Sequence, residues 1–448
     1  MKKVLDSQLY AGENSLLFEF TGGLDVDRRL YKQEIKVQKA WAKAMASAGY
    51  ITSEELLALD SALDDALQDI KSGVFIWSLQ DEDIHMNLER YLTEKTGELG
   101  KKIHLGRSRN DLIASTLRLF VHDQLEITEA KIRELVCSVQ KKSTEWSDYL
   151  LPGLTHAQSG KVCSLGHMFL AHGWALTRDL RRHRLAAESC LESLPLGAGP
   201  FSGTQLNINL TALASELGFK SPLFHAYDAV GDRDFMIDAM QSFSTLAIHL
   251  ARLSEEIIFW SSGPAGVMQL PAQWSTGSSV MPNKRNPDIC ELIRARCSRI
   301  IGYADSGSHL LKSVLPSYGS DLHELKKTFF LALDDIHACL TIFPKLIDGL
   351  EANETRCLEL LNHGHVLATD IANILCEKGS SFRDAYRMTS SWVSEAEKQG
   401  KQVHELDSVK QLLKATPDFM TAVSLSDNLG GCSPKQRIIS NKNLEKFI

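Results

Sequence analysis

Two stretches of this chain run very far without glycine or proline, the residues that most often interrupt a helix. Residues 107–151 and residues 232–262 contain neither, and runs of about 45 and about 31 residues far exceed the ~10–14 residues of an ordinary globular helix. Within the second run, apolar residues recur every three or four positions, which is the period of one helix face. They are Phe235, Met236, Met240, Phe243, Ala247, Leu250 and Leu253. Long helices therefore dominate what this chain can fold into.

A third run, residues 162–194, has the same pattern, although Gly166 and Gly173 interrupt it. At about 1.5 Å per residue, a helix of about 45 residues is roughly 65 Å long. Such a rod needs an equally long partner surface, so the sequence predicts an all-α fold built on an extended helical bundle that is shared between subunits. We expect three domains. They are an N-terminal helical domain at 1–105, a central long-helix bundle at 106–355 and a small C-terminal helical domain at 356–448.

Composition excludes several classes of protein. The 49 Lys and Arg against 56 Asp and Glu give no global positive field for a nucleic acid or an anionic membrane. The nine cysteines are scattered without a C-x-x-C pair, which favours a reducing cytosol and disfavours structural zinc. No apolar segment precedes Asp6, and no uncharged apolar run reaches about 18 residues. We therefore expect a cytoplasmic protein with no membrane span, no nucleic-acid partner and no metal.

Residues 277–291 form the most distinctive loop: Gly-Ser-Ser-Val-Met-Pro-Asn-Lys-Arg-Asn-Pro-Asp-Ile-Cys-Glu. The small residues at its start let a loop move or approach a ligand closely. Lys284 and Asn286 supply donors, and Pro287 is suited to open a helix, an arrangement that favours an anion. A solvated basic loop is the simpler interpretation. The rare combination of Gly-Ser-Ser with Met-Pro-x-Lys-x-Asn-Pro argues against it.

That combination resembles the signature of the fumarase, aspartase and argininosuccinate lyase superfamily, in which it forms a mobile loop over the active site. Other motifs resemble argininosuccinate lyases within that superfamily, and the likeness runs from about Phe20 to about Pro434. These motifs are Asp81-Glu82-Asp83-Ile84-His85, Gly106-Arg107-Ser108-Arg109-Asn110-Asp111, Leu154-Thr155-His156-Ala157-Gln158, Pro195-Leu196-Gly197-Ala198-Gly199, Asp228-Ala229-Val230-Gly231-Asp232-Arg233-Asp234 and Gly430-Gly431-Cys432-Ser433-Pro434.

The resemblance implies a three-domain fold whose central bundle forms the core of a homotetramer, with each active site assembled from three subunits. It implies cleavage of argininosuccinate into arginine and fumarate, without a metal or an organic cofactor. The residues implied to act in catalysis are Ser278, His156, Glu291 and Lys284. Those implied to bind substrate are Ser108, Arg109, Asn110, Thr155, Asn286, Tyr318, His323, Lys326, Asp83 and His85.

The chemistry of such an elimination suits these residue types. Removing a proton from the carbon beside a carboxylate builds negative charge on that carboxylate, so fixed cations and hydrogen-bond donors must surround it. Lys284, Asn286, Arg109 and Asn110 are groups of this kind. The resemblance puts them, together with Thr155, around the fumarate half of the substrate.

Two residues compete for the role of base. Residue chemistry alone favours His156, because a serine hydroxyl is a poor base unless its anion is strongly stabilised. The resemblance pairs His156 with Glu291, which would hold the imidazole in one tautomer and favour its charged form. It assigns the base to Ser278 and leaves His156 to assist or to act on the leaving group. We follow the resemblance, since loop closure beside Lys284 and backbone donors could stabilise the serine anion.

The sequence departs from argininosuccinate lyases where the arginine end of the substrate is expected. A serine of the family, four residues before an Asp-x-Arg-Leu stretch, is Gly23 here. In a later Tyr-x-Lys-Asp-x-Gln pattern, the glutamine is His323 and the inner lysine is Ser320, whereas Tyr318 and Lys326 match. The sequence therefore leaves the identity of the amine half of the substrate undetermined, whereas it specifies the succinyl half.

Three functions follow from these observations. The first is a carbon–nitrogen lyase acting on argininosuccinate. The second keeps the chemistry but releases fumarate from a different N-substituted aspartate. The third is a non-catalytic, crystallin-like structural protein that keeps only the fold. Packing alone would not require both an acid–base pair and an anion loop, so the residues present argue against the third: Thr155, His156, Ser278, Lys284 and Glu291.

Overall fold

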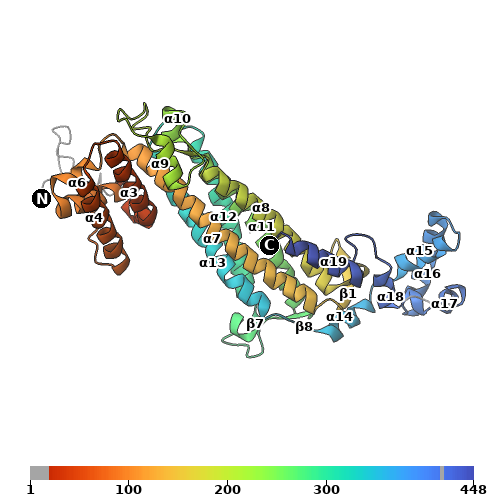
Figure 1. Cartoon of the computed structure of the whole chain (residues 1–448). Coiled ribbons are helices and arrows are strands. Elements are labelled where there is room, and N and C mark those ends of the chain that lie inside the picture. The colour runs from red at the N-terminus through yellow and green to blue at the C-terminus, as the bar shows by residue number, and fades with distance from the viewer. Residues whose placement is uncertain (1–19, 414–417, 448) are drawn as a thin grey trace. The chain divides into compact units, whose positions relative to one another are not determined.

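The computed structural model describes residues 20–413 and 418–447, and most of them are helical (Figure 1). The helical fold class predicted from the sequence is therefore confirmed for the single chain. The longest described helices are α7 (Arg109–Glu145), α8 (Leu165–Cys190), α11 (Asp234–Ser261), α12 (Asp288–Leu311) and α13 (Asp321–Asp348).

Both runs without glycine or proline are helical, over α7 and α11. The first helix ends at Glu145 because β1 (Leu150–Thr155) begins soon after it and pairs with β2 (Gln158–Ser164). The prediction of helix from residue 162 is therefore wrong at its start. Ser164 instead caps α8, since its hydroxyl accepts a hydrogen bond from the His167 amide at 3.2 Å.

The chain divides into two compact units, each made of three chain segments. Of the described residues, the first unit takes those in the ranges 1–129, 182–244 and 299–335, and the second takes those in the ranges 130–181, 245–298 and 336–448. Each of the five long helices contributes residues to both units. The division into three consecutive domains stays a prediction.

The first unit is built on α3 (Tyr31–Ser47) and α4 (Ser53–Ser72), whose apolar faces bury Trp41 and Leu59 in its core. Thr52 and the side chain of a following glutamate form a capping box that starts α4. Short parallel strands β3 (Ser193–Leu194) and β4 (Ser221–Pro222) pair. Its other short elements are α2 (Leu24–Asp27), η1 (Arg28–Leu30), η2 (Leu79–Asp81), α5 (Ile84–Thr96), α6 (Glu98–Lys102), α9 (Leu210–Leu217) and α10 (Ala226–Gly231).

The second unit carries the β1–β2 hairpin and two shorter antiparallel pairs. These are β5 (Met268–Gln269) with β8 (Glu351–Ala352), and β6 (Thr276–Gly277) with β7 (Arg285–Asn286). The hairpin contributes to a core with the short helices that follow α13. The remaining elements are η3 (Ala272–Trp274), α14 (Glu354–Leu361), α15 (Ala368–Glu377), α16 (Phe382–Gln399), η4 (Val403–Glu405), α17 (Asp407–Leu413), α18 (Phe419–Ser424) and α19 (Pro434–Glu445).

Two expectations from the sequence can be compared with the structure, one about membrane-spanning helices and one about the cysteines. Of the helices described, none combines the length and the apolar character needed to cross a membrane. All nine cysteines are free thiols.

Candidate active site

An ion-pair cluster joins the start of α7 to the start of α5. Nη1 of Arg109 donates to Glu82 Oε2 and to Asp83 Oδ2, both at 3.1 Å. Asp83 also caps α5, since its Oδ1 accepts from the Met86 amide at 2.9 Å. Burial disfavours the charged guanidinium, but the Asp83 and Glu82 carboxylates raise the pKa of Arg109 above its ordinary value. Arg109, predicted to bind substrate, is thus already held by two protein carboxylates.

Glu82 itself has a rare backbone conformation, with φ 58° and ψ −54°. It centres a tight turn in which the Asp83 amide donates to the Asp81 carbonyl at 2.6 Å. A positive φ in a residue other than glycine costs roughly 1–3 kcal/mol and is often found at functional sites. This turn carries both the carboxylate that binds Arg109 and the carbonyl that accepts from the Gly23 amide at 3.3 Å.

His85 lies buried beside a buried glutamate of α3. Its Nδ1 is 2.8 Å from Glu34 Oε1, an ion pair rather than a well-aligned hydrogen bond, because neither ring nitrogen meets hydrogen-bond geometry. Glu34 also accepts from the Thr116 hydroxyl at 2.8 Å. Burial alone would lower the pKa of His85, but Glu34 raises it. Burial likewise opposes the charge of Glu34, whose pKa is lowered by His85 and Arg107. Each partner therefore favours the charged form of the other.

A reciprocal cap starts α7. The Ser108 hydroxyl accepts from the Asn110 amide at 3.2 Å, and the Ser108 amide donates to Asp111 Oδ1 at 2.9 Å. The other oxygen of Asp111 accepts from the amides of Gly197 at 3.1 Å and Gly199 at 2.8 Å. Burial raises the pKa of Asp111 to about 6, against these three amide donors. Ser108 thus helps to build the helix start that positions the arginine next to it.

Three predicted substrate residues gather around Asp27. Nζ of Lys326 donates to Asp27 Oδ1 at 2.5 Å, and the two side chains are only 3% and 2% exposed. The Tyr318 hydroxyl shares a hydrogen bond with Nε2 of His323 at the start of α13. Burial raises the pKa of Tyr318 to about 12. Burial lowers the pKa of His323, and the neighbouring charge of Lys326 lowers it further.

The clusters around Arg109 and Asp27 form one polar region within the first unit. Asp83 raises the pKa of Tyr318 and Arg109 opposes that rise, both through their charges. The structure therefore brings five predicted substrate residues into one neighbourhood: Asp83, Arg109, Tyr318, His323 and Lys326.

His156 lies at the tip of the β1–β2 hairpin. Thr155 pairs with Gln158 across the hairpin, which leaves His156 and Ala157 as a two-residue turn with φ 53° and 57°. Such turns normally use asparagine and glycine, because both central residues need a positive φ. A side chain in this conformation costs roughly 1–2 kcal/mol per residue. Thr155 and His156 are exposed, so the strained turn presents the imidazole outward from the hairpin.

Ser278 follows β6, which pairs with β7 and closes the loop between them. The Ser278 hydroxyl oxygen accepts hydrogen bonds from the amides of Val280 at 3.2 Å and Met281 at 3.0 Å. Two amide donors aimed at one oxygen stabilise negative charge on it. Val280 is 83% exposed, so the loop carries an apolar side chain into solvent. Lys284 is exposed and Asn286 half-buried on the returning arm.

Glu291 lies in the first turn of α12, exposed to solvent. Over the described part of the chain, no hydrogen bond or ion pair joins it to His156, although both residues belong to the second unit. The predicted pair of imidazole and carboxylate is thus not formed within one chain.

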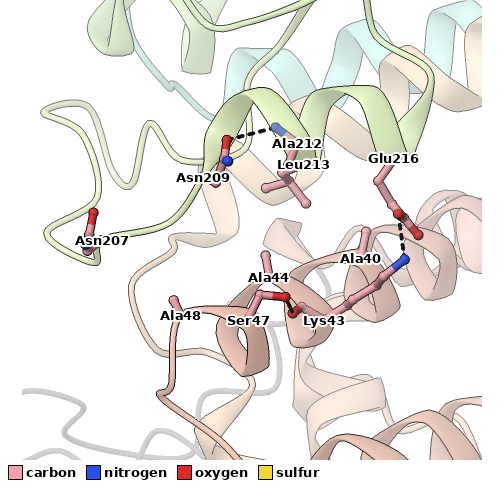
Figure 2. Close-up of a pocket in the computed structure, with 10 residues that line it drawn as sticks. All are labelled: Ala40, Lys43, Ala44, Ser47, Ala48, Asn207, Asn209, Ala212, Leu213 and Glu216. Atoms are coloured by element: carbon pink, nitrogen blue, oxygen red, sulfur yellow. Dashed lines mark hydrogen bonds and ion pairs between the residues drawn. The ribbon is translucent and has the colours of Figure 1, made fainter.

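Two cavities lie away from the predicted residues. One of about 160 Å³ lies between α3 and α9, where alanines face a segment that begins at Asn207 (Figure 2). A Lys43–Glu216 ion pair of 2.7 Å spans it. A second, of about 790 Å³, is bordered by α8, α11 and α19. None of the predicted site residues lines either cavity.

Sequence reasoning missed the roles of Asp27, Glu34, Arg107 and Asp111. A signal existed for Glu34, which shares the buried face of α3 with apolar Trp41 and Met45, because a charged residue on an apolar stripe needs a buried partner. No local pattern links Asp27 to Lys326, which is 299 residues away. Within 20–413 and 418–447, no group of three or more His, Cys, Asp or Glu side chains is arranged to hold a metal ion.

Comparison with known proteins gives matches along most of the chain. Residues 12–302 match a family described as lyase, and residues 365–426 match the argininosuccinate lyase C-terminal family. The argininosuccinate lyase of Lawsonia intracellularis is 36% identical and covers 90% of this chain and 88% of its own length. The argininosuccinate lyase of Desulfovibrio desulfuricans is 35% identical and covers 95% of this chain and 93% of its own length.

Two solved structures share the fold. EDDS lyase in complex with formate has a TM-score of 0.83 at 22% identity and covers 96% of this chain and 88% of its own. A class II fumarase from Schistosoma mansoni has a TM-score of 0.72 at 19% identity, covering 86% and 87%.

Proposed function

This chain belongs to the argininosuccinate lyase family, and from that premise we propose that it cleaves argininosuccinate reversibly into arginine and fumarate. The observation that carries the mechanism is the Ser278 hydroxyl, whose oxygen accepts two backbone amides in an exposed loop. A serine hydroxyl is a poor base unless its anion is stabilised, and these two donors would stabilise that anion.

In the proposed reaction Ser278 acts as its alkoxide, which removes a proton from the succinyl carbon beside a carboxylate and becomes the hydroxyl. The electron pair left on that carbon forms the double bond of fumarate, and the bond from the neighbouring carbon to nitrogen breaks. The leaving nitrogen takes up a proton, and His156 is suited to supply or to guide it. On the arm of the same loop, the Lys284 ammonium would offset the charge that builds on the carboxylate, and the Asn286 amide would donate a hydrogen bond to it.

We propose that the active protein is a homotetramer whose sites are completed between subunits. Among the described residues His156 and Glu291 are not paired with each other, which supports this, because a carboxylate from another copy could complete the pair. Large apolar side chains also lie exposed on the long helices, where a second copy would bury them. They include Ile127, Leu185, Ile248, Phe259, Leu292, Ile301 and Leu331. The free cysteines support a reducing, cytoplasmic location.

Fumarate release, followed as ultraviolet absorbance at about 240 nm, tests this function. We expect argininosuccinate to be cleaved and Ser278→Ala to abolish most of the turnover. Cleavage of a different N-substituted aspartate in preference to argininosuccinate would favour the second function, which the departures at Gly23 and His323 keep open. If none of these aspartate adducts is cleaved, the result would favour the third function, a non-catalytic structural protein.

A further inference from the structure

Two thiols from distant parts of the chain meet beside the β1–β2 hairpin. Cys163 lies on β2, and Cys432 lies in the loop between α18 and α19, within the Gly-Gly-Cys-Ser-Pro motif. Their side chains share a hydrogen bond. Both residues are half-buried in the second unit, and Cys432 packs against the core to which the hairpin contributes. The fold therefore brings together two sulfurs that the proposed lyase reaction does not use.

The loop that carries Cys432 is fixed to β2 at both of its ends. On one side α18 packs against β2. On the other side Arg437 of α19 donates to the hydroxyl of Ser164 at 2.6 Å, and Ser164 directly follows Cys163. In the middle of the loop Leu429 is 88% exposed, so this apolar side chain does not anchor it. Cys432 therefore stays beside Cys163 but can move by the small distance that separates two hydrogen-bonded sulfurs from two bonded ones.

A buried guanidinium acts on both sulfurs. Arg437 is only 4% exposed, its Nε has no hydrogen-bond partner among the described residues, and its charge favours the thiolate form of both cysteines. Hydrogen bonds from the thiol of Cys163 and from the hydroxyl of Ser426 lower the pKa of Cys432 to about 6, against its burial. The bond to Cys432, together with burial, raises the pKa of Cys163. Near neutral pH, Cys432 is therefore the thiolate, and Cys163 is the thiol that donates to it.

We propose that Cys163 and Cys432 form a reversible disulfide when the protein meets hydrogen peroxide. The Cys432 thiolate attacks one oxygen of the peroxide and becomes a sulfenic acid, while the O–O bond breaks and hydroxide leaves. The Cys163 sulfur then attacks the Cys432 sulfur, so that the S–S bond forms, the S–O bond breaks, and the oxygen leaves as water with the thiol proton. The two sulfurs together lose two electrons, which the peroxide takes up. A thiolate beside a second thiol is typical of cysteine redox sensors, and disulfides in cytosolic proteins are usually transient ones of this kind.

Mass spectrometry of the full chain after treatment with hydrogen peroxide tests the proposal. In the wild type we expect the loss of two hydrogen atoms and a cross-linked pair of peptides that contain Cys163 and Cys432, and dithiothreitol should reverse both changes. Cys163→Ser keeps a hydrogen-bond donor beside Cys432 but removes the second sulfur, so a sulfenic acid should accumulate on Cys432 and be trapped by dimedone. Cys432→Ser removes the attacking thiolate, so oxidation of Cys163 should be at least about ten-fold slower than disulfide formation in the wild type.

Cys376→Ser is the matched control. Cys376 is also half-buried and packs against the same core, so its loss should leave the cross-link and its rate of formation unchanged.

Two outcomes would overturn the proposal. One is a folded wild-type protein that, after treatment with peroxide, yields no peptide pair joining Cys163 to Cys432. This result needs no variant, so it decides the question even if a serine variant does not fold. The other is oxidation of Cys163 in folded Cys432→Ser at the wild-type rate, which would exclude Cys432 as the attacking sulfur. Neither measurement uses fumarate release, so the disulfide and the proposed lyase function are tested separately.

Discussion

Replacing Lys326 by methionine should destabilise the protein far more than the loss of a surface charge. Nζ of Lys326 lies 2.5 Å from Asp27 Oδ1, and both side chains are buried. At an effective dielectric constant of about 20, unit charges at that separation attract by roughly 7 kcal/mol. That attraction offsets the several kcal/mol needed to take each ion out of water. Methionine removes the attraction but leaves the carboxylate buried, so we expect the free energy of unfolding to fall by about 3–5 kcal/mol.

Two further variants separate this effect from simple loss of a lysine. Asp27→Asn/Lys326→Met leaves no buried charge, and we expect it to recover at least half of the lost stability. Lys327→Met removes the neighbouring lysine, which is 40% exposed and pairs with Glu324 at 2.6 Å. An exposed pair of this kind contributes about 0.2–1 kcal/mol, so its loss should hardly be measurable.

The assay is urea unfolding followed by circular dichroism at one fixed protein concentration, because the stability of an oligomer depends on concentration. KM for argininosuccinate should be recorded on the same preparations, since Lys326 is also a predicted substrate residue. A Lys326→Met protein within about 1 kcal/mol of the wild type would refute the reasoning. It would mean that Asp27 does not carry an uncompensated charge once its partner is gone.

Three other predictions concern the site, the pH dependence and the assembly. His156→Asn should lose most of kcat and keep its oligomeric state, because asparagine tolerates the positive φ of 53° at the hairpin tip; full activity in the purified variant would remove the imidazole from the mechanism. The raised pKa of His85 means that its stabilising contribution is complete below its ordinary value of 6.5 and is lost as pH rises through the folded value. The lowered pKa of Glu34 means that its contribution is complete above 4.5 and is lost as pH falls through the folded value. The contribution of this pair to the urea midpoint should therefore be largest between about pH 4.5 and 6.5. Glu34→Gln should flatten the dependence of the midpoint on pH. An unchanged dependence in that variant would exclude the pair as its source. Light scattering at micromolar concentration should give a mass well above the monomer, whereas a monomer would contradict the shared site.

The helices could be predicted because their signal is local. The long gaps between glycines and prolines correspond to α7 and α11, with ends within a few residues for α11. The prediction failed at residue 162, where β2 continues to Ser164. An apolar run at this position fits a helix or a strand equally well. It forms a strand because it pairs with β1, which lies outside the short stretch of sequence that the helix pattern considers.

The site was predictable only as a set of residue types. Motifs drew attention to Arg109, Asp83 and His85, but they did not show that Glu82 and Asp83 hold the guanidinium of Arg109, and Glu34, the partner of His85, lies outside every motif. The contact between Gly23 and His323 joins two positions that stand apart in every local window. A sequence shows that both are unusual. Only the structure shows that the two positions are in contact, because the His323 ring lies against the site that a side chain at Gly23 would occupy.

The division of the chain into two units of three segments each also bears on how such a gene can change. Recombination exchanges continuous stretches of coding sequence, and no single crossover can replace residues 1–129, 182–244 and 299–335 without carrying parts of the other unit along. A hybrid gene would also join halves of long helices that came from different parents. Neither unit can therefore be exchanged as one continuous stretch of coding sequence.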